Sequence, residues 1–184
     1  MIDLRLERRS SPVGSMMVVT DRDGVLRALD FIDYEARLRE LLARHYSAFT
    51  LTEAPLAKPV AQALDAYFDG DLSAIVDLPG ATGGTAFQRT VWAALRTIPA
   101  GTTLSYGALA RQIGQPTASR AVGLANGSNP IAIVVPCHRV IGANGSLTGY
   151  AGGLPRKRWL LEHELRHSRA AAPAFALEMA SGFH

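Results

Sequence analysis

Apolar residues near the start of the chain form two segments with the length of β-strands. The segments 15–20 and 25–31 are rich in Val, Leu and Met, and the residues between them, 21–24, read Asp-Arg-Asp-Gly. Asp and Gly suit a tight hairpin connection. We therefore predict a pair of antiparallel strands at this position.

Apolar residues with helical spacing follow. They cover 33–45 and 56–68, and one face of the second range carries Val60, Leu64, Tyr67 and Phe68. A short apolar segment at 74–78 predicts a third strand. The first part of the chain is therefore expected to form a small unit of strands and helices.

The second half of the chain carries further helical patterns. A helix is predicted over 85–97, and Ser105 can cap a short helix over 106–113. Pro116 suits the first turn of a helix over 117–126. Two short helices joined by a tight Gly-Gln-Pro turn are typical of a helix-turn-helix.

The last segments differ sharply in character. An unbroken apolar segment, 131–135, predicts a buried strand that leads into Pro-Cys-His-Arg-Val at 136–140. A glycine-rich loop follows at 142–153, and a last helix is predicted over 155–167. The Ala-rich remainder, 168–184, is expected to be a disordered tail without a function.

Charge changes sign at Ala-Thr-Gly-Gly, 81–84, which we interpret as a hinge. Residues 1–84 hold 9 basic and 13 acidic side chains, whereas residues 85–184 hold 10 and 3. The stretch 85–161 contains eight basic residues and no acidic residue. A surface of one sign suits nucleic acid, but a basic soluble domain would have the same composition.

The 184 residues suffice for two small domains, which we place at 1–80 and 85–167. The first residues lack the apolar core of a signal peptide, and no apolar run approaches the ~20 residues that span a bilayer. Cys137 is the only cysteine, so an internal disulfide and a cysteine zinc cluster are excluded. A soluble, cytoplasmic protein without a metal site is expected.

Cys137 has neighbours that are unusual for an inert, buried thiol. It follows a proline at the end of an apolar segment, and His138 and Arg139 adjoin it. A proton acceptor and a positive charge convert a thiol to a thiolate below its reference pKa of ~8.5. Because successive strand residues point to opposite faces, His138 would reach Cys137 through a water or across a turn of the chain. The alternative, a small hydrophobic core residue, stays open at this point.

The pentapeptide 136–140 resembles the active-site motif of the O6-alkylguanine-DNA alkyltransferases. Further segments resemble motifs of this family in order and spacing: Ser105-Tyr106-Gly107, Arg120-Ala121-Val122-Gly123, Asn129-Pro130, Gly149-Tyr150-Ala151-Gly152-Gly153 and Leu160-Leu161-Glu162-His163-Glu164. The resemblance is strong over about 85–166 and looser before it, through Ser11-Pro12-Val13-Gly14.

The resemblance implies an α/β (α+β) fold. Its N-terminal domain would be a small ribonuclease H-like three-stranded sheet with helices. Its C-terminal domain would be mostly helical, with a winged-helix-like helix-turn-helix and a short active-site strand.

Four residues would carry the reaction that the resemblance implies. Cys137 would be the nucleophile, His138 the base that acts through water, and Glu164 the group that orients His138. Asn129 would tie the helix-turn-helix to the active-site turn. Without the resemblance, Glu164 would be interpreted as a surface carboxylate and Asn129 as part of an Asn-Pro turn.

The implied partner is double-stranded DNA that carries O6-alkylguanine, bound through its minor groove. Arg120 would fill the space left by a flipped nucleotide, and Tyr106 would crowd the neighbouring phosphate. The small residues of helix 117–126 would allow close approach to DNA, or tight packing within the protein. Further contacts to DNA are expected from Gly107, Gln115 and Ser119.

The pocket for the flipped base would be formed by Val140, Tyr150, Ala151 and Gly152. Some relatives carry a hydroxyl residue in place of Ala151, but the contact expected there is a backbone N–H. The resemblance implies no cofactor. Some relatives hold zinc in the first domain, and the single cysteine leaves no such site in this chain.

The implied reaction is one transfer of an alkyl group from O6-alkylguanine, or from O4-alkylthymine, to Cys137. The thioether product is a poor leaving group, so each chain would react once. The protein would act as a monomer that could bind DNA cooperatively, and in a bacterium it would be associated with the nucleoid.

Two other classes of protein remain as alternatives. A non-catalytic lesion sensor would lack Cys137, and a helix-turn-helix regulator would need base-reading side chains that the small-residue helix does not supply. A cysteine hydrolase would leave the DNA-binding motifs unexplained.

Overall fold

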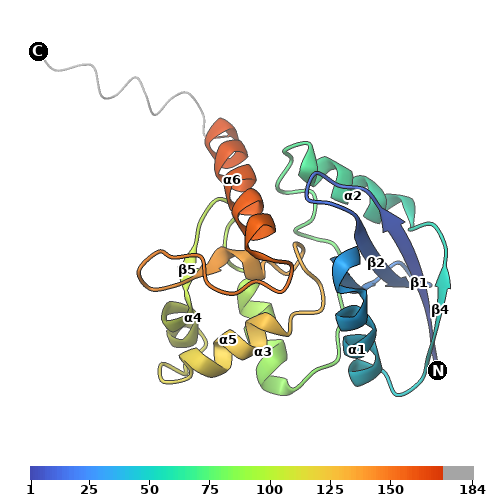
Figure 1. The fold of residues 1–184 in the computed structure, drawn as a ribbon, viewed down its shortest axis with the longest axis horizontal. Coiled ribbons are helices and arrows are strands. Elements are labelled where there is room, and N and C mark those ends of the chain that lie inside the picture. Colours follow the sequence, from blue (N-terminus) through green and yellow to red (C-terminus); the bar gives the residue numbers. More distant parts are fainter. Residues whose placement is uncertain (172–184) are drawn as a thin grey trace, which may run out of the picture.

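A computed structural model describes residues 1–171 of the chain. Figure 1 shows two units side by side, a sheet with helices α1 and α2 in one and helices α3 to α6 in the other. The expected α/β class with a small N-terminal sheet and a helical C-terminal unit is confirmed. No helix within 1–171 is long and apolar enough to cross a membrane.

The N-terminal sheet has four strands in the order β3-β2-β1-β4, one more than expected. The hairpin is confirmed, because β2 (Met16–Asp21) pairs antiparallel with β3 (Leu26–Phe31). The additional strands are β1 (Ile2–Arg9), antiparallel to β2, and β4 (Phe49–Glu53), parallel to β1.

The segment 74–78, expected to be a strand, consists of turns. Backbone N–H groups of Ala74, Val76 and Leu78 each donate to the carbonyl three residues earlier. The Asp71 carboxylate accepts from the backbone N–H of Ser73, which starts this turn. A local side-chain acceptor thus replaces a sheet partner, and the prediction was wrong.

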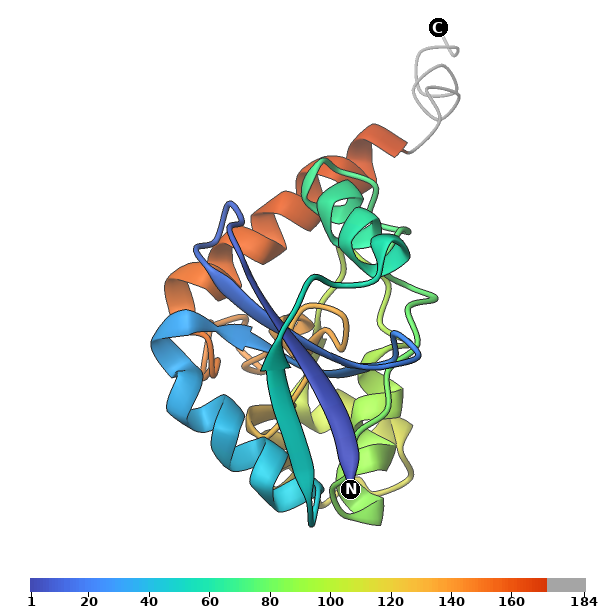
Figure 2. The same ribbon diagram turned by 90° about the vertical axis from the view of Figure 1, so that its right-hand side faces the viewer.

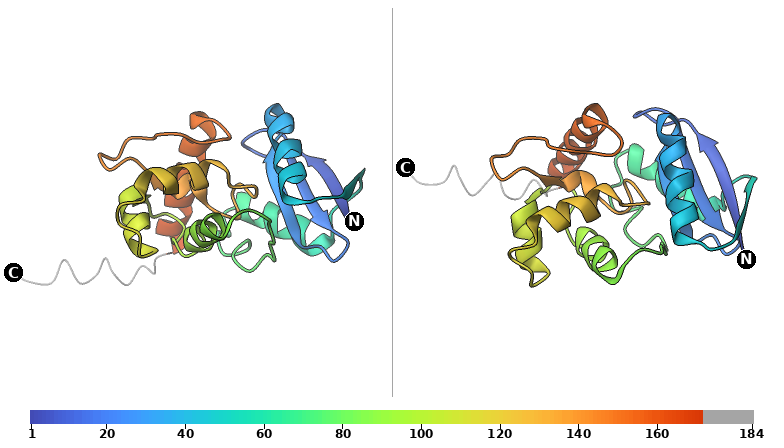
Figure 3. Two further views of the ribbon diagram at one scale, coloured as in Figure 1. Left: turned by 90° about the horizontal axis from the view of Figure 1, so that it is seen from below. Right: turned by 60° about the horizontal axis from the view of Figure 1, so that its bottom comes forward.

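Both faces of the sheet are covered. Helix α1 (Glu35–His45) lies across one face, as Figure 3 shows, and the apolar cluster under it includes Leu4, Leu6, Met17, Val19, Ala28, Leu38 and Leu42. The short helix η1 (Ile32–Tyr34) joins β3 to α1. The other face packs against α2 (Lys58–Phe68) and the C-terminal unit, and all six residues of β2 are therefore buried.

The C-terminal unit is built on helices. They are α3 (Ala86–Leu95), α4 (Tyr106–Gln112), α5 (Ser119–Gly127) and α6 (Leu154–Ala171). Thr85 and Gln88 form a reciprocal cap at the start of α3, and Ser105 caps α4. Helix α5 begins at Ser119, two residues later than expected, so Pro116 lies in the connecting turn.

The segment 131–135 is buried as expected but is not a strand. Ile131 makes one isolated bridge to Leu29, and the chain then turns, with Ile133 at a φ of 70°. The turns lead into η2 (Cys137–Arg139) and β6 (Val140–Ile141), which pairs parallel with β5 (Leu104–Ser105). The core surrounds the segment 131–135. Its apolar side chains therefore pack into the core from a turn and not from a strand.

The two units share one hydrophobic core across their boundary. Backbone hydrogen bonds link Leu29 of β3 to Pro130 and Ala132, and Leu26 to Pro79 and Ala81. Figure 2 shows α6 beside α2, where the ring Nε2 of His163 lies 2.8 Å from the Tyr67 carbonyl. The segment proposed as a hinge, 81–84, thus joins units that also contact directly.

Helix α6 continues to Ala171, so the expected disordered tail does not begin at residue 168. Tertiary contacts of its last turns account for the difference, since a Cβ on Gly101 would lie 2.3 Å from the Ser168 hydroxyl. The rest of the expected tail, 172–184, lies outside the described residues.

Candidate active site and nucleic-acid interface

Cys137 begins a single 3₁₀ turn in which three consecutive side chains are buried. Cys137, His138 and Arg139 are 4%, 0% and 7% exposed. The turn brings all three inside because it replaces the alternation of a strand. Burial raises the pKa of the Cys137 thiol, while the nearby Asn129 side chain acts in the opposite direction. The resting sulfur is therefore a thiol that needs a base.

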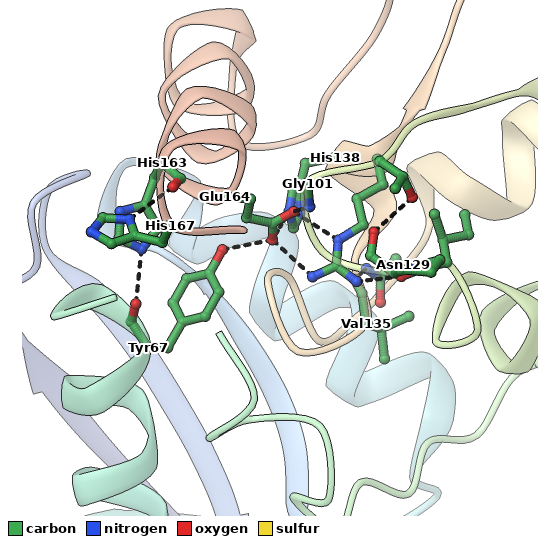
Figure 4. Close-up of polar contacts among 12 residues, drawn as sticks. Tyr67, Gly101, Asn129, Val135, His138, His163, Glu164 and His167 are labelled. Atoms are coloured by element: carbon green, nitrogen blue, oxygen red, sulfur yellow. Dashed lines mark hydrogen bonds and ion pairs between the residues drawn. The ribbon is translucent and has the colours of Figure 1, made fainter. Parts of the chain in front are cut away.

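Glu164 of α6 collects the polar groups behind the turn. Its Oε1 lies 2.8 Å from His138 Nε2 and accepts from Arg139 Nη2 at 2.8 Å, and its Oε2 accepts from Arg139 Nε at 2.9 Å. The Tyr67 hydroxyl donates to Oε1 at 2.8 Å and the Gly101 N–H to Oε2 at 3.3 Å. Figure 4 shows Glu164 between Tyr67 and His138.

This carboxylate is ionised although it is fully buried. Burial opposes the charge, but His138 and Arg139 outweigh it and hold the pKa of Glu164 well below its usual range. A buried charge is stable only when its partners saturate it. The structure thus brings Glu164 to His138, as the sequence motif implied, and adds Arg139 to the same group.

His138 presents one free ring nitrogen. Nε2 is occupied by Glu164, whereas the buried Nδ1 has no hydrogen-bond partner among residues 1–171. An unpaired buried nitrogen at this position is costly unless water or substrate reaches it. Nδ1 is therefore the atom through which His138 can accept a proton.

Asn129 connects the end of α5 to the active-site turn. Its Nδ2 donates to the Val135 carbonyl at 2.8 Å, and its Oδ1 accepts from the Ile131 N–H at 3.0 Å. From the N-terminal unit, Arg37 donates to the carbonyls of Gly127 and Asn129. The turn that carries Cys137 is thereby fixed from both units.

A cavity of about 140 Å³ opens beside the sulfur. Of the four residues expected to form a base pocket, Tyr150 and Ala151 line it, and the Tyr150 hydroxyl is buried without a partner in the described chain. The other residues that line the cavity are Tyr106, Gly123, Asn126, Gly127, Cys137 and Gly149. Larger cavities elsewhere, such as one of about 360 Å³ beside Trp92, are not lined by Cys137.

The other two residues expected in the pocket are not among those that line the cavity. Val140 is fully buried in β6. Gly152 packs so closely that an added Cβ would lie 2.4 Å from the Phe31 ring. Neither residue is therefore open to a base in the cavity.

Lys157 holds this loop from below. Its Nζ donates to the carbonyls of Val140, Thr148 and Gly149 at 2.6, 2.9 and 3.1 Å, and burial lowers its pKa to about 8. Sequence reasoning missed this residue because Arg-Lys-Arg is typical of a solvated helix face. Its spacing of three from the buried Leu160 is the signal that could have found it.

The residues expected to contact DNA lie on helices α4 and α5 and in the turn between them, and one of them, Tyr106, lines the cavity. Tyr106 is half-buried, and its hydroxyl donates to the Thr148 carbonyl at 3.1 Å. Arg120 is exposed at the start of α5 and forms no hydrogen bond or ion pair within 1–171. Gln115 is exposed, and Gly107 and Ser119 are half-buried where the two helices meet.

Small residues of α5 lie both on the side that packs against α4 and on the exposed side. Gly123 faces the ring of Tyr106, with 3.8 Å available to an added Cβ, whereas Ala121 is exposed. Leu124 is 73% exposed, one helical turn after Arg120. The exposed face of α5 thus combines a cation that has no partner within 1–171 with small and apolar side chains. Within the described chain, no cluster of His, Cys, Asp and Glu could hold a metal ion.

Comparisons with known proteins cover both units. The DNA-binding domain of 6-O-methylguanine DNA methyltransferase matches residues 86–166, and the ribonuclease-like domain of the same family matches residues 7–79. Methylated-DNA–protein-cysteine methyltransferase from Shigella flexneri is 52% identical over 166 residues, which cover 89% of this chain and 97% of that protein.

Crystal structures agree with these matches. Mycobacterium tuberculosis OGT in complex with DNA has a TM-score of 0.75 and 44% identity, over 92% of this chain and 96% of that chain. O6-methylguanine-DNA methyltransferase from the archaeon Pyrococcus kodakaraensis has a TM-score of 0.69 and 25% identity, over 88% of this chain and 98% of that chain.

Proposed function

Because this chain belongs to the 6-O-methylguanine DNA methyltransferase family, we propose that it repairs DNA by moving an alkyl group onto Cys137. The substrate is O6-alkylguanine in duplex DNA, and O4-alkylthymine as a second lesion. The observation that carries the proposal is that Cys137 lines a cavity and is followed in the same turn by His138, which is paired with the buried Glu164.

The chemistry follows from the raised pKa of the thiol. His138 Nδ1 takes the thiol proton through a water, and Glu164 stabilises the imidazolium that forms. The sulfur then attacks the alkyl carbon, so that an S–C bond forms and the C–O bond of the lesion breaks. The electron pair of the C–O bond passes to the guanine. The guanine takes up the proton that His138 received and leaves unmodified.

The cavity lies inside the protein, so the damaged nucleotide must leave the DNA stack. Flipping costs a few kcal/mol of lost pairing and stacking. Arg120, an exposed cation without a partner within 1–171, would fill the vacated space, and Tyr106, which lines the cavity, would crowd the neighbouring phosphate. Gly107, Gln115 and Ser119 would contact the DNA backbone.

The exposed face of α5 would lie in the minor groove. Its small side chains permit close approach, and they offer few groups for reading base sequence. A protein that must find lesions in any sequence benefits from this arrangement. We expect a monomer to bind one lesion, and in a bacterium the protein would be located at the nucleoid.

Each chain reacts once under this proposal. The product is a thioether, which has no acidic proton and is a poor leaving group toward water. No residue that lines the cavity could remove the alkyl group from sulfur. The protein is consumed by its reaction.

Substitution of the nucleophile tests the proposal. Cys137→Ala is expected to abolish transfer from O6-methylguanine DNA and to leave the affinity for that DNA within about twofold, because the surface of α5 is unchanged. Filter binding and release of labelled methyl groups measure the two quantities. If wild-type protein bound the lesion without transfer, the chain would be a sensor, and if Cys137→Ala lost both activities, the site would be misassigned.

A further inference from the structure

Tyr67 reaches the active site from the other unit. It lies in α2 and is fully buried, and its hydroxyl donates to Glu164 Oε1 at 2.8 Å. The same oxygen lies 2.8 Å from His138 Nε2. One carboxylate oxygen thus joins a side chain of the N-terminal unit to the base of the proposed reaction (Figure 4).

Contacts of both the backbone and the ring of Tyr67 fix the position of this side chain. The carbonyl of Tyr67 lies 2.8 Å from His163 Nε2, and the ring packs edge-on against Phe68 and His163, at 5.3 Å from each. Trp159 stacks on His163 at 4.8 Å. Helices α2 and α6 therefore hold the hydroxyl and Glu164 in one arrangement.

The hydroxyl stays protonated in this environment. Burial, together with the negative charge of Glu164, raises the pKa of Tyr67 well above its usual value. The other ionisable groups around this site are Arg139 on η2, His163 on α6, Tyr150 on the loop and Cys137 beside His138. Tyr67 is a neutral side-chain donor to Glu164, and so it stabilises the carboxylate without adding charge.

We propose that Tyr67 is a positioning residue of the transfer reaction. Its hydroxyl holds Glu164, and thereby the His138 ring whose Nδ1 is free to accept a proton, and it shares the charge on Oε1 with His138 and Arg139. This assigns the N-terminal unit a part in the chemistry. The inference rests on the proposed function.

Tyr67→Phe removes the hydroxyl and keeps the packed ring, and Tyr46→Phe is the matched control. The Tyr46 hydroxyl donates to the carbonyl of Ala81 in the segment 81–84, without contact to Glu164. Each variant is tested for the rate of methyl transfer at saturating DNA, for DNA affinity, and for thermal unfolding. The rate at saturation is then measured from pH 5 to 9.

Tyr67→Phe is expected to slow transfer about tenfold at neutral pH with unchanged DNA affinity, as expected when a hydrogen bond to a charged group is lost. The acidic limb of its pH–rate profile should move to higher pH, because Oε1 without the Tyr67 hydrogen bond stabilises a positive charge on the His138 ring more strongly. Tyr46→Phe should match the wild type in both measurements.

A second readout does not depend on DNA. The rate at which iodoacetamide alkylates Cys137 follows the same base, and its acidic limb should shift in Tyr67→Phe alone. If the wild type transferred no alkyl group from DNA, the proposed function would fail, while this measurement would still test Tyr67.

Two results would overturn the inference. One is an unchanged profile and rate in Tyr67→Phe. The other is a uniform loss at every pH with a lower unfolding temperature, which would give Tyr67 a structural role alone.

Discussion

Glu164 balances the positive charge that is buried in the turn of Cys137. Arg139 and His138 are buried beside it, and Arg139 also donates to the Ile98 carbonyl. Removing the carboxylate charge would leave a guanidinium in the core without its counter-ion. Loss of one partner of a buried pair costs about 3–5 kcal/mol. The network therefore stabilises the fold as well as the proposed reaction.

The pH dependence of stability follows from the lowered pKa of Glu164. A carboxylate with a lower pKa in the folded chain contributes fully above its ordinary value of 4.5, and this contribution is lost as the pH falls below it. Glu164→Gln should therefore reduce the free energy of unfolding by about 3 kcal/mol at pH 7, and by progressively less below pH 4.5. Urea unfolding of both proteins from pH 7 to pH 3 measures the difference. A difference that stayed constant with pH would show that Glu164 is not the titrating group.

Individual residues differed in how far the sequence could predict them. Cys137 and His138 were found because one short motif contains both. The partner of Arg139 lies 25 residues away in the chain, and no local pattern links the two. Lys157 was missed because its burial depends on carbonyls of a loop that the sequence does not place.

Among the elements, α5 presents the surface that we expect to contact DNA. Arg120 should assist duplex repair alone, because only a base in a duplex leaves a gap in the stack. Arg120→Ala is expected to slow repair of O6-methylguanine in duplex DNA by roughly 10- to 100-fold, which corresponds to a few kcal/mol of flipping cost. Reaction with the free modified base should stay within about twofold.

The control for this prediction is Arg158→Ala, which removes another exposed positive charge, on α6. It should weaken duplex repair only slightly, through the general attraction of the backbone for cations. Equal losses of duplex and free-base reaction in Arg120→Ala would contradict the role of this residue.

Elements defined by periodic patterns and caps were predicted well, and segments shaped by the core were not. The hairpin and helices α1 to α4 matched because their signals are local. In β1, Ile2, Leu4 and Leu6 alternate with charged residues, a strand signal that was overlooked. The segment 131–135 has the composition of a strand but turns, because β3 and the C-terminal unit enclose it.

At the scale of the whole molecule, the charge boundary at 81–84 does not divide the core. The N-terminal unit contributes Arg37 and Tyr67 to the surroundings of the active turn. Tyr67 and Glu164 are 97 residues apart, so their contact depends on how the units pack. A pattern along the sequence could predict each unit but not this connection between them.

The stoichiometry of transfer is the most direct test of the central claim, that Cys137 itself receives the alkyl group. The protein is mixed with a large excess of duplex DNA containing O6-methylguanine, and intact mass and peptide masses are recorded over time. We predict one added methyl group per chain, on the peptide that contains Cys137, and repaired lesions equal in number to chains. Repair of many lesions per chain, or a methyl group on another residue, would contradict the account.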